Sequence, residues 1–240
     1  NWLFAGSGAK YLWNSLKVTF LYSMGEILVT MVGGMLLALL FNRMTRSFGL
    51  MRAFVFVPKY VAMSSAAVVF LWILNTDAGV LNYLLQCIGL PAVDWLNQQS
   101  TALPSVLMLT GWRVIGYGMM IYLSAMIGIS QEYYEAASLD GANGFQKLFR
   151  ITLPLLSPTT LFLLVTTFLS SMKVFQSVDI LTSGGPARST EVFVYLIYRY
   201  ALVDFRMDRA STAAVMFFLI LLTITILTMK LSDRSVTYDS

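Results

Sequence analysis

Long apolar runs alternate along the chain with shorter polar stretches. A helix needs roughly 20 predominantly apolar residues to cross a bilayer, and several of the runs reach that length. The pattern predicts about five membrane spans, at residues 13–41, 50–74, 102–127, 157–181 and 210–229. Two shorter helices are expected between them, an interfacial helix at 80–90 and an aromatic-rich surface helix at 190–201. The chain is therefore predicted to be all-α, a polytopic helical bundle in a single transmembrane domain over residues 1–240.

Residues within the first two spans predict how these spans pack. Gly33, Gly34 and Ala38 give the first span a face of small residues, which allows a neighbouring helix to approach closely. Pro58 is expected to kink the second span. Glu26 lies in the middle of the first span, where a charge costs roughly 3 kcal/mol on insertion scales. Its side chain is therefore expected to face protein or water, either bonded to a neighbouring span or placed on a transport pathway.

Composition supports a membrane protein and narrows its chemistry. The chain is 58% hydrophobic and 12% charged, about half the charged fraction of a soluble domain. It has no histidine, and its single cysteine excludes an internal disulfide. Basic residues are scattered without interleaved aromatics, so nucleic acid is not an expected partner. No phosphate-cradling Gly-x-x-x-x-Gly-Lys-Ser/Thr motif is present, so ATP hydrolysis is not expected of this chain. No catalytic residue, metal or cofactor is expected either.

The polar stretch between the third and fourth spans is composed like a folded unit. Residues 131–138 are good helix formers, and residues 143–150 place apolar side chains on one face at helical spacing. Gly141 lies in the turn between them and is expected to take a positive φ. Pro154 is expected to break the second helix before the next span. The sequence therefore predicts a short helix-turn-helix outside the bilayer, suited to docking against another protein.

This stretch also resembles the cytoplasmic loop signature of the membrane subunits of bacterial ABC importers. The matching pattern is Glu-Ala-Ala, three residues, Gly, nine residues, Ile, one residue and Leu-Pro, which is filled by Glu135, Ala136, Ala137, Gly141, Ile151, Leu153 and Pro154. The resemblance implies that the loop at 131–153 couples to an ATPase subunit. The expected coupling residues are Glu135, Ala136, Ala137, Asp140 and Gly141. The alternative is an amphipathic re-entry loop that has no partner.

Further segments resemble the carbohydrate branch of these importers, in the position of the first of its two membrane subunits. They lie at 112–113, 175–179, 184–186, 189–191 and 198–199. Glycerol-phosphate importers share much of this pattern, so a sugar and a phosphorylated or plain polyol both stay open as the solute. The resemblance implies a second, homologous permease subunit, two ATPase subunits and an external solute-binding protein as partners.

Basic residues predict the orientation in the bacterial cytoplasmic membrane. The loops after the first, third and fifth spans carry Arg43, Arg46, Lys147, Arg150, Lys230 and Arg234. The loop after the second span carries no Lys or Arg, so the docking loop and the C-terminus are predicted to be cytoplasmic and Asn1 external. Arginines in the loop after the fourth span oppose this count. An external start with an odd number of spans suggests that a preceding span belongs to the natural chain.

Polar side chains in the third and fourth spans are candidates for the substrate pathway. Trp112, Arg113 and Tyr117 are expected near the external end of the third span. Lys173, Gln176 and Asp179 are spaced by three residues, which predicts that they share one helical face in the outer part of the fourth span. Planar polar groups and aromatic faces are the usual partners of sugars.

Two alternatives to this sugar pathway remain open. One is an ion pair of Asp179 with Lys173 or Arg113 that only fixes helix packing. The other is a proton-coupled carrier that uses Glu26 and Asp179, the acidic residues within the predicted spans.

Overall fold

The computed structural model describes residues 7–42 and 46–235, and these residues form helices joined by turns and loops. The first half contains α1 (Ser7–Leu28), η1 (Val29–Gly33), α2 (Gly34–Phe41), α3 (Arg46–Phe56), η2 (Val57–Tyr60), α4 (Met63–Ile73), α5 (Val80–Cys87) and α6 (Gln99–Ile127). The second half contains α7 (Gln131–Leu139), α8 (Gly144–Lys147), η3 (Leu148–Thr152), α9 (Leu153–Leu155), α10 (Ser157–Ser171), α11 (Gln176–Thr182), α12 (Phe193–Tyr198), η4 (Arg199–Val203) and α13 (Met207–Ser235). Asn1 and Arg43, which contribute to the predicted orientation, lie outside the described residues.

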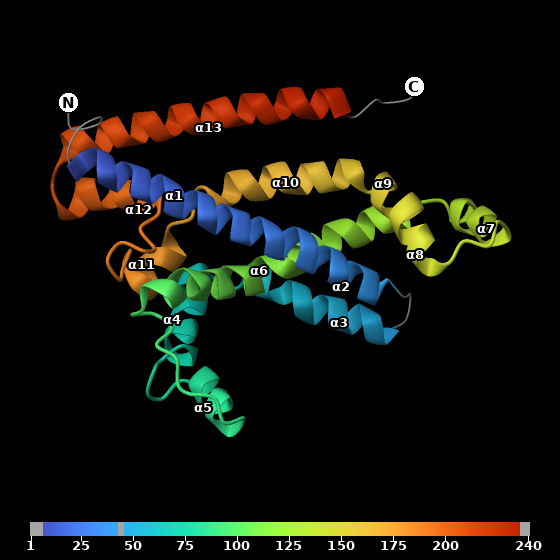
Figure 1. Cartoon of the computed structure of the whole chain (residues 1–240), viewed down its shortest axis with the longest axis horizontal. Coiled ribbons are helices and arrows are strands. Elements are labelled where there is room, and N and C mark those ends of the chain that lie inside the picture. Colours follow the sequence, from blue (N-terminus) through green and yellow to red (C-terminus); the bar gives the residue numbers. More distant parts are fainter. Residues whose placement is uncertain (1–6, 43–45, 236–240) are drawn as a thin grey trace.

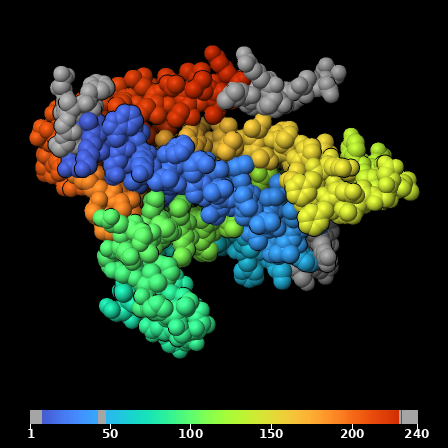
Figure 2. Space-filling view, viewed as in Figure 1, coloured from blue at the N-terminus to red at the C-terminus, as the bar shows by residue number. Residues whose placement is uncertain are grey.

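The long helices lie roughly along one axis of the molecule (Figure 1). Two parts stand out from this bundle in Figure 2: the lobe around α5, and the tip formed by α7 and α8 at the opposite end. Within the described residues, three helices are long and apolar enough to cross a membrane, and up to five crossings result if each of two sharply bent helix pairs counts as one. The prediction of an all-α bundle with about five spans is confirmed.

The first span is a single long helix, Gly8–Phe41, interrupted by the π-helical turn η1. It packs along α6 through small residues, as predicted. A Cβ added to Gly34 would lie 2.8 Å from the carbonyl carbon of Gly118, and Ala38 is fully buried nearby. Only residues with little or no side chain allow the two backbones to come this close.

The second span is broken rather than gently kinked. The helical segments Phe48–Tyr60 and Met63–Ile73 meet at an angle of 102°. The first segment ends in the 3₁₀ turn η2, which contains Pro58, a residue that has no backbone N–H to donate and cannot continue an α-helix. The predicted effect of Pro58 is confirmed, and it is larger than a kink.

The fourth span is also broken, and here the prediction of one continuous helix at 157–181 is wrong. Helix α10 ends at Ser171, and α11 begins only at Gln176. Phe175 has left the helical conformation, with φ −145° and ψ −64°. Its ring packs against Tyr195 and Tyr198, with ring centroids 6.1 Å and 5.0 Å away. The two tyrosines are distant from Phe175 in sequence, so helical spacing alone did not reveal the break.

The predicted helix at 190–201 exists as α12 and η4, but it is not a surface helix. Phe193 and Leu196 are fully buried, and the segment packs between α1 and α13. Its aromatic residues are core residues, with the rings of Phe193 and Phe217 stacked 4.7 Å apart. The aromatic residues of this predicted surface helix therefore contribute to internal packing.

The lobe around α5 confirms the expected short helix at 80–90, which ends at Cys87. Asn82 holds the lobe together and is buried. Its amide nitrogen donates to the carbonyls of Thr76 and Val93, and its amide oxygen accepts from the backbone N–H of Val93 and from the Trp95 indole. This polar side chain is satisfied on both atoms, which fixes the chain that leads into α6.

Candidate functional site

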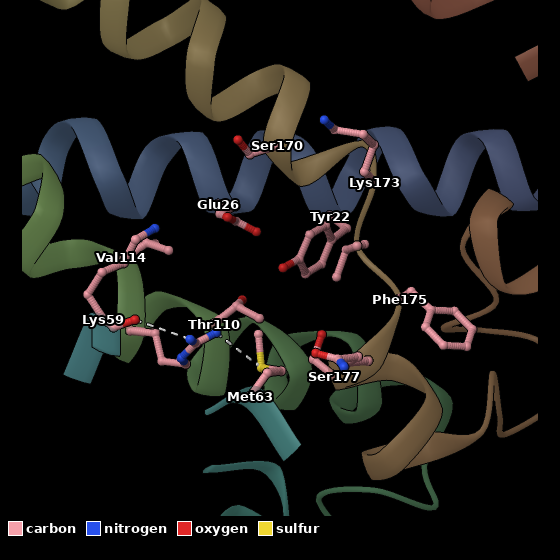
Figure 3. Close-up of a pocket in the computed structure, with 13 residues that line it drawn as sticks. Tyr22, Glu26, Lys59, Met63, Thr110, Val114, Ser170, Lys173, Phe175 and Ser177 are labelled. Carbon is pink, nitrogen blue, oxygen red and sulfur yellow. Dashed lines mark hydrogen bonds between the residues drawn. The ribbon is translucent and has the colours of Figure 1, made fainter. Parts of the chain in front are cut away.

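A cavity of about 520 Å³ opens inside the bundle where the two broken spans meet α1 and α6 (Figure 3). The break in the second span contributes Lys59 and Met63, and the break in the fourth contributes the segment from Lys173 to Ser177. Helix α1 supplies Tyr22 and Glu26. Non-helical backbone at membrane depth is tolerated where it lines a protein-enclosed cavity, so the two breaks are explained by the space they surround.

The cavity brings together several of the predicted pathway residues. Arg113, Lys173 and Gln176 line it. Tyr117 lines a neighbouring cavity of about 250 Å³, which shares Glu26 and Lys59 with the first. The two cavities are therefore parts of one polar region between the helices.

Trp112 and Asp179 do not line either of these cavities. Trp112 packs beside Phe70, with ring centroids 5.5 Å apart. Asp179 follows Gln176 within α11 and does not share a helix with Lys173, which lies in the break before it. The expected common helical face of Lys173, Gln176 and Asp179 is therefore absent.

The predicted pathway residues of the third span lie at a different depth along α6 than expected. Trp112, Arg113 and Tyr117 lie near the middle of the helix Gln99–Ile127, not near its external end. The expected third span at 102–127 matches α6 closely, so the difference lies in depth rather than in the span itself. A site at this depth is far from either end of the bundle.

Arg113 has a structural task that the sequence did not reveal. Its Nη2 donates to the backbone carbonyls of Lys59 at 3.2 Å and Val61 at 2.8 Å, and its Nη1 lies 3.4 Å from the sulfur of Met63. These carbonyls belong to the break in the second span, where no helical partner is available. Arg113 thus ties α6 to the break while its charge stays at the cavity wall.

Glu26 faces the cavity, as expected for a charge in mid-span, and is only 7% exposed. The hydroxyl of Tyr22 points toward its carboxylate (Figure 3). Lys59 lies across the same space, and its ammonium is 4.8 Å from the centre of the Tyr117 ring, which is cation–π range. Lys59 was not predicted as a site residue, although a lysine directly after a proline in an apolar run is a detectable signal.

The ion pair proposed as an alternative for Asp179 is not formed. Among the side chains that the structure describes, the ion pairs join Arg188 and Arg199 to Glu191, and Arg206 to Asp208. The cavity cations Lys59, Arg113 and Lys173 take part in none of these pairs. In the same part of the chain, no group of three or more His, Cys, Asp or Glu side chains is arranged to hold a metal ion.

The predicted helix-turn-helix forms a separate site at the tip of the molecule. Helix α7 leads through a turn to α8, and Gly141 in this turn has φ +77°, as predicted. The following helical segment runs through Pro154 and ends at Leu155, with a bend of 60° before α10. The break therefore falls slightly later than predicted.

Hydrogen bonds make this tip a rigid unit. The Tyr134 hydroxyl and the Thr152 Oγ1 are 3.0 Å apart, and the ammonium of Lys147 donates to Ser138 Oγ at 2.6 Å. Asn143 and Gln146 form a reciprocal capping box at the start of α8. The two helices are thus fixed relative to each other.

The surface of the tip is apolar and exposed. Leu139 is 90% exposed, and the rings of Phe145 and Phe149, stacked 6.2 Å apart, are also exposed. Glu135, Ala136 and Asp140 are exposed on the same short element, and Ala137 is half-buried. Apolar side chains concentrated on a protruding, rigid element mark a protein–protein contact.

These features define a helical membrane transport protein with an internal polar cavity and a protruding, rigid helix-turn-helix. Residues 30–238 match the family described as the binding-protein-dependent transport system inner membrane component, and the chain belongs to this family. It is 34% identical to a probable ABC transporter permease protein, YurN of Bacillus subtilis (strain 168), over 91% of this chain and 76% of the relative. It is 33% identical to the sn-glycerol-3-phosphate transport system permease protein UgpA of Agrobacterium fabrum, over 97% of this chain and 79% of the relative.

A solved structure supports the same assignment. A chain from the crystal structure of a bacterial ABC transporter involved in the import of the acidic polysaccharide alginate is 28% identical and superimposes with a TM-score of 0.87. The match covers 98% of this chain and 82% of that chain. The protein is therefore a multi-pass permease subunit of an ABC importer.

Proposed function

We propose that this chain moves a sugar-type solute through its cavity and receives the driving force through the tip formed by α7 and α8. The observation that carries the proposal is the exposed apolar surface of Leu139, Phe145 and Phe149 on a rigid, protruding element. ATP-binding subunits would seat this element and move it as they associate. Rigid-body movement of the attached helices would then open the cavity to alternate sides.

The chemistry of the cavity fits a polyhydroxylated solute. Gln176, Thr110 and Ser170 offer amide and hydroxyl groups, and Tyr22 offers an aromatic ring with a polar tip. Names of the relatives point to the same solute class, since they include a glycerol-3-phosphate permease and a transporter of the polysaccharide alginate. A sugar is the first candidate for this chain, and glycerol phosphate or another polyol is the second.

The proposed assembly contains a second, homologous permease subunit, two ATPase subunits and an extracytoplasmic solute-binding protein. The family description itself names binding-protein dependence. We expect the second permease subunit to complete the cavity. ATP hydrolysis is assigned to the ATPase subunits.

The proposed orientation places the tip in the cytoplasm. The ends of α2 and α13 point toward the same end of the molecule as α7, while α4 and α5 lie toward the other end (Figure 1). The basic loop residues predicted to be cytoplasmic are therefore attached to one end of the bundle. The lobe around α5 would face outward, where the solute-binding protein delivers its cargo.

The docking surface is tested by copurifying the ATPase subunits with the variant Leu139→Ser. We expect a large loss of association, because Leu139 is 90% exposed at the tip. Leu90→Ser, in the lobe at the other end, removes a half-exposed leucine and should leave association unchanged. Normal association of Leu139→Ser would contradict docking through this surface.

The driving force is tested in liposomes that hold the whole complex. Uptake should require ATP and the binding protein, and it should survive collapse of the proton gradient. Uptake that persists without ATP and stops when the proton gradient collapses would instead support a proton-coupled carrier using Glu26.

A further inference from the structure

The cavity between the broken spans carries an excess of positive charge. Among the described residues, its lining contains Lys59, Arg113 and Lys173 but only one carboxylate, that of Glu26. These residues come from η2, from α6, from the break after α10 and from α1, so the excess results from the fold and not from one basic stretch. Bundles that expose cations to an internal cavity usually do so for function.

Contacts within the chain do not neutralise this excess. Arg113 donates through Nη2 to the neutral carbonyls of Lys59 and Val61, which do not cancel its charge. Its Nε is buried and has no hydrogen-bond partner among the described residues. Lys59 lies over the Tyr117 ring, another neutral partner. Within the described residues, no carboxylate lies within 4.0 Å of the charged nitrogen atoms of Lys59, Arg113 or Lys173.

Lys173 is the cation most available to a bound molecule. It lies in the turn between α10 and α11 and is exposed rather than packed. Ser170 precedes it and Gln176 follows it on the same wall, so hydroxyl and amide groups flank the ammonium. The ring of Phe175 points away from this space (Figure 3), which leaves the wall polar.

From this arrangement we propose that the transported solute is an anion: a polyhydroxylated molecule that carries a phosphate ester or a carboxylate. The anionic group is held among Lys173, Lys59 and Arg113, and the hydroxyl groups bond to Gln176, Ser170 and Glu26. Charge-assisted hydrogen bonds are roughly twice as strong as neutral ones, so this cavity favours the charged member of a neutral and anionic pair. The proposal rests on the proposed function and narrows its substrate class.

The test is competitive uptake by the reconstituted complex with its ATPase subunits and binding protein, in phosphatidylcholine vesicles that lack anionic lipid. The vesicles receive an equal mixture of glucose, glucuronate, glucose 6-phosphate, maltose, glycerol and glycerol 3-phosphate, and mass spectrometry identifies what accumulates with ATP. We expect an anionic member to accumulate and its uncharged counterpart to stay outside. Accumulation of a neutral member alone would overturn the inference and still support the proposed function, whereas no accumulation and no ATPase stimulation would count against both.

Variants then show whether the positive side chains of the cavity bind the anionic group of the solute. Lys173→Gln should raise the apparent KM for the accumulated anion by about tenfold or more, because one charge-assisted bond is lost. Lys173→Arg keeps the positive charge and should return the apparent KM most of the way to the wild-type value. Lys59→Met removes a second positive charge, from another wall of the cavity, and should also raise the apparent KM. Lys17→Met is the matched control, since Lys17 is exposed on α1 and does not line the cavity. A normal KM in both Lys173→Gln and Lys59→Met would overturn the proposal.

Discussion

At the scale of single residues, Gly141 sets the shape of the tip formed by α7 and α8. Its φ of +77° lies in the left-handed region, and a Cβ placed there would meet open space. The cost of a side chain would therefore come from the backbone conformation and not from a clash. The turn connects the exposed helix α7 to α8, so any change in its angle changes the direction of the proposed contact surface.

We expect Gly141→Asp to impair coupling while the membrane helices still insert. A non-glycine residue in this conformation costs on the order of 1 kcal/mol, and relief of that strain would tilt α7 relative to α8. ATPase activity stimulated by solute should fall sharply in the reconstituted complex. Gly144→Ala is the control, because its added Cβ also meets open space and its φ is not positive. Normal transport by Gly141→Asp would show that this turn tolerates other conformations.

Glu26 is the second residue whose role can be isolated, because it is the one carboxylate in the cavity lining. Glu26→Gln keeps the shape and the hydrogen-bonding groups but removes the negative charge. Uptake of an anionic solute should continue with an apparent KM lowered severalfold, since one like charge close to the anion is worth about 1 kcal/mol or more. Asp77→Asn, on the exposed outer lobe, should change nothing. Abolished uptake would mean that the carboxylate itself is required, as in a proton-coupled carrier.

Sequence reasoning found part of this site. Arg113, Lys173 and Gln176 stood out because polar residues inside apolar runs must face protein or water, and all three line the cavity. Lys59 was missed because it lies beside Pro58, where the span was expected to bend but not to open. Asp179 was grouped with Lys173 by helical spacing, and that spacing has no meaning across a break.

At the scale of elements, the segment before α12 depends on one buried carboxylate. Glu191 is fully buried and accepts from Arg188 at 3.1 Å and from Arg199 at 3.0 Å. Arg188 also lies 3.6 Å from the centre of the Tyr11 ring, and its carbonyl accepts from Asn14. The group therefore joins α1, η4 and the loop between α11 and α12.

We expect Glu191→Ala to destabilise the protein strongly, by about 3–5 kcal/mol, because it leaves two arginines without their buried partner. Thermal unfolding of the purified permease complex in detergent measures this loss. Asp208→Ala is the matched control: its pair with Arg206 spans 3.6 Å and both side chains are largely exposed. An exposed pair contributes about 0–1 kcal/mol, so the control should unfold near the wild-type temperature. Equal stability of the two variants would contradict the role assigned to Glu191.

Elements were predicted well where one local cause decides the structure. The long helices α6 and α13 follow from apolar length, and the break at η2 follows from Pro58. The break before α11 instead accompanies the contacts of Phe175 with Tyr195 and Tyr198, and the burial of α12 accompanies its packing against α1 and α13. Contacts between residues distant in sequence are set by the tertiary fold, so one sequence without its structure did not reveal them.

At the scale of the whole molecule, α10 connects the tip formed by α7 and α8 with the cavity. It begins at Ser157, directly after the bend that follows the tip, and it reaches Ser170 at the cavity wall. A helix of this length extends about 22 Å at 1.5 Å per residue. Because α10 packs along α1, a movement of the tip would reach the cavity through a stiff, supported element.

The hydrogen bond between Tyr134 and Thr152 joins α7 directly to this path, in addition to the bond from Lys147 to Ser138. Thr152 is buried, and it lies in η3, which leads through α9 into α10. Tyr134→Phe keeps the ring and removes the 3.0 Å contact, so α7 can still dock but can move without carrying α10 along. We expect ATP hydrolysed per solute imported to rise severalfold, with association of the ATPase subunits unchanged. Tyr83→Phe, which alters an exposed tyrosine of α5, is the control and should keep the wild-type ratio. If Tyr134→Phe also kept that ratio, force would have to reach the cavity by a route other than this hydrogen bond, such as the backbone of α8 and η3.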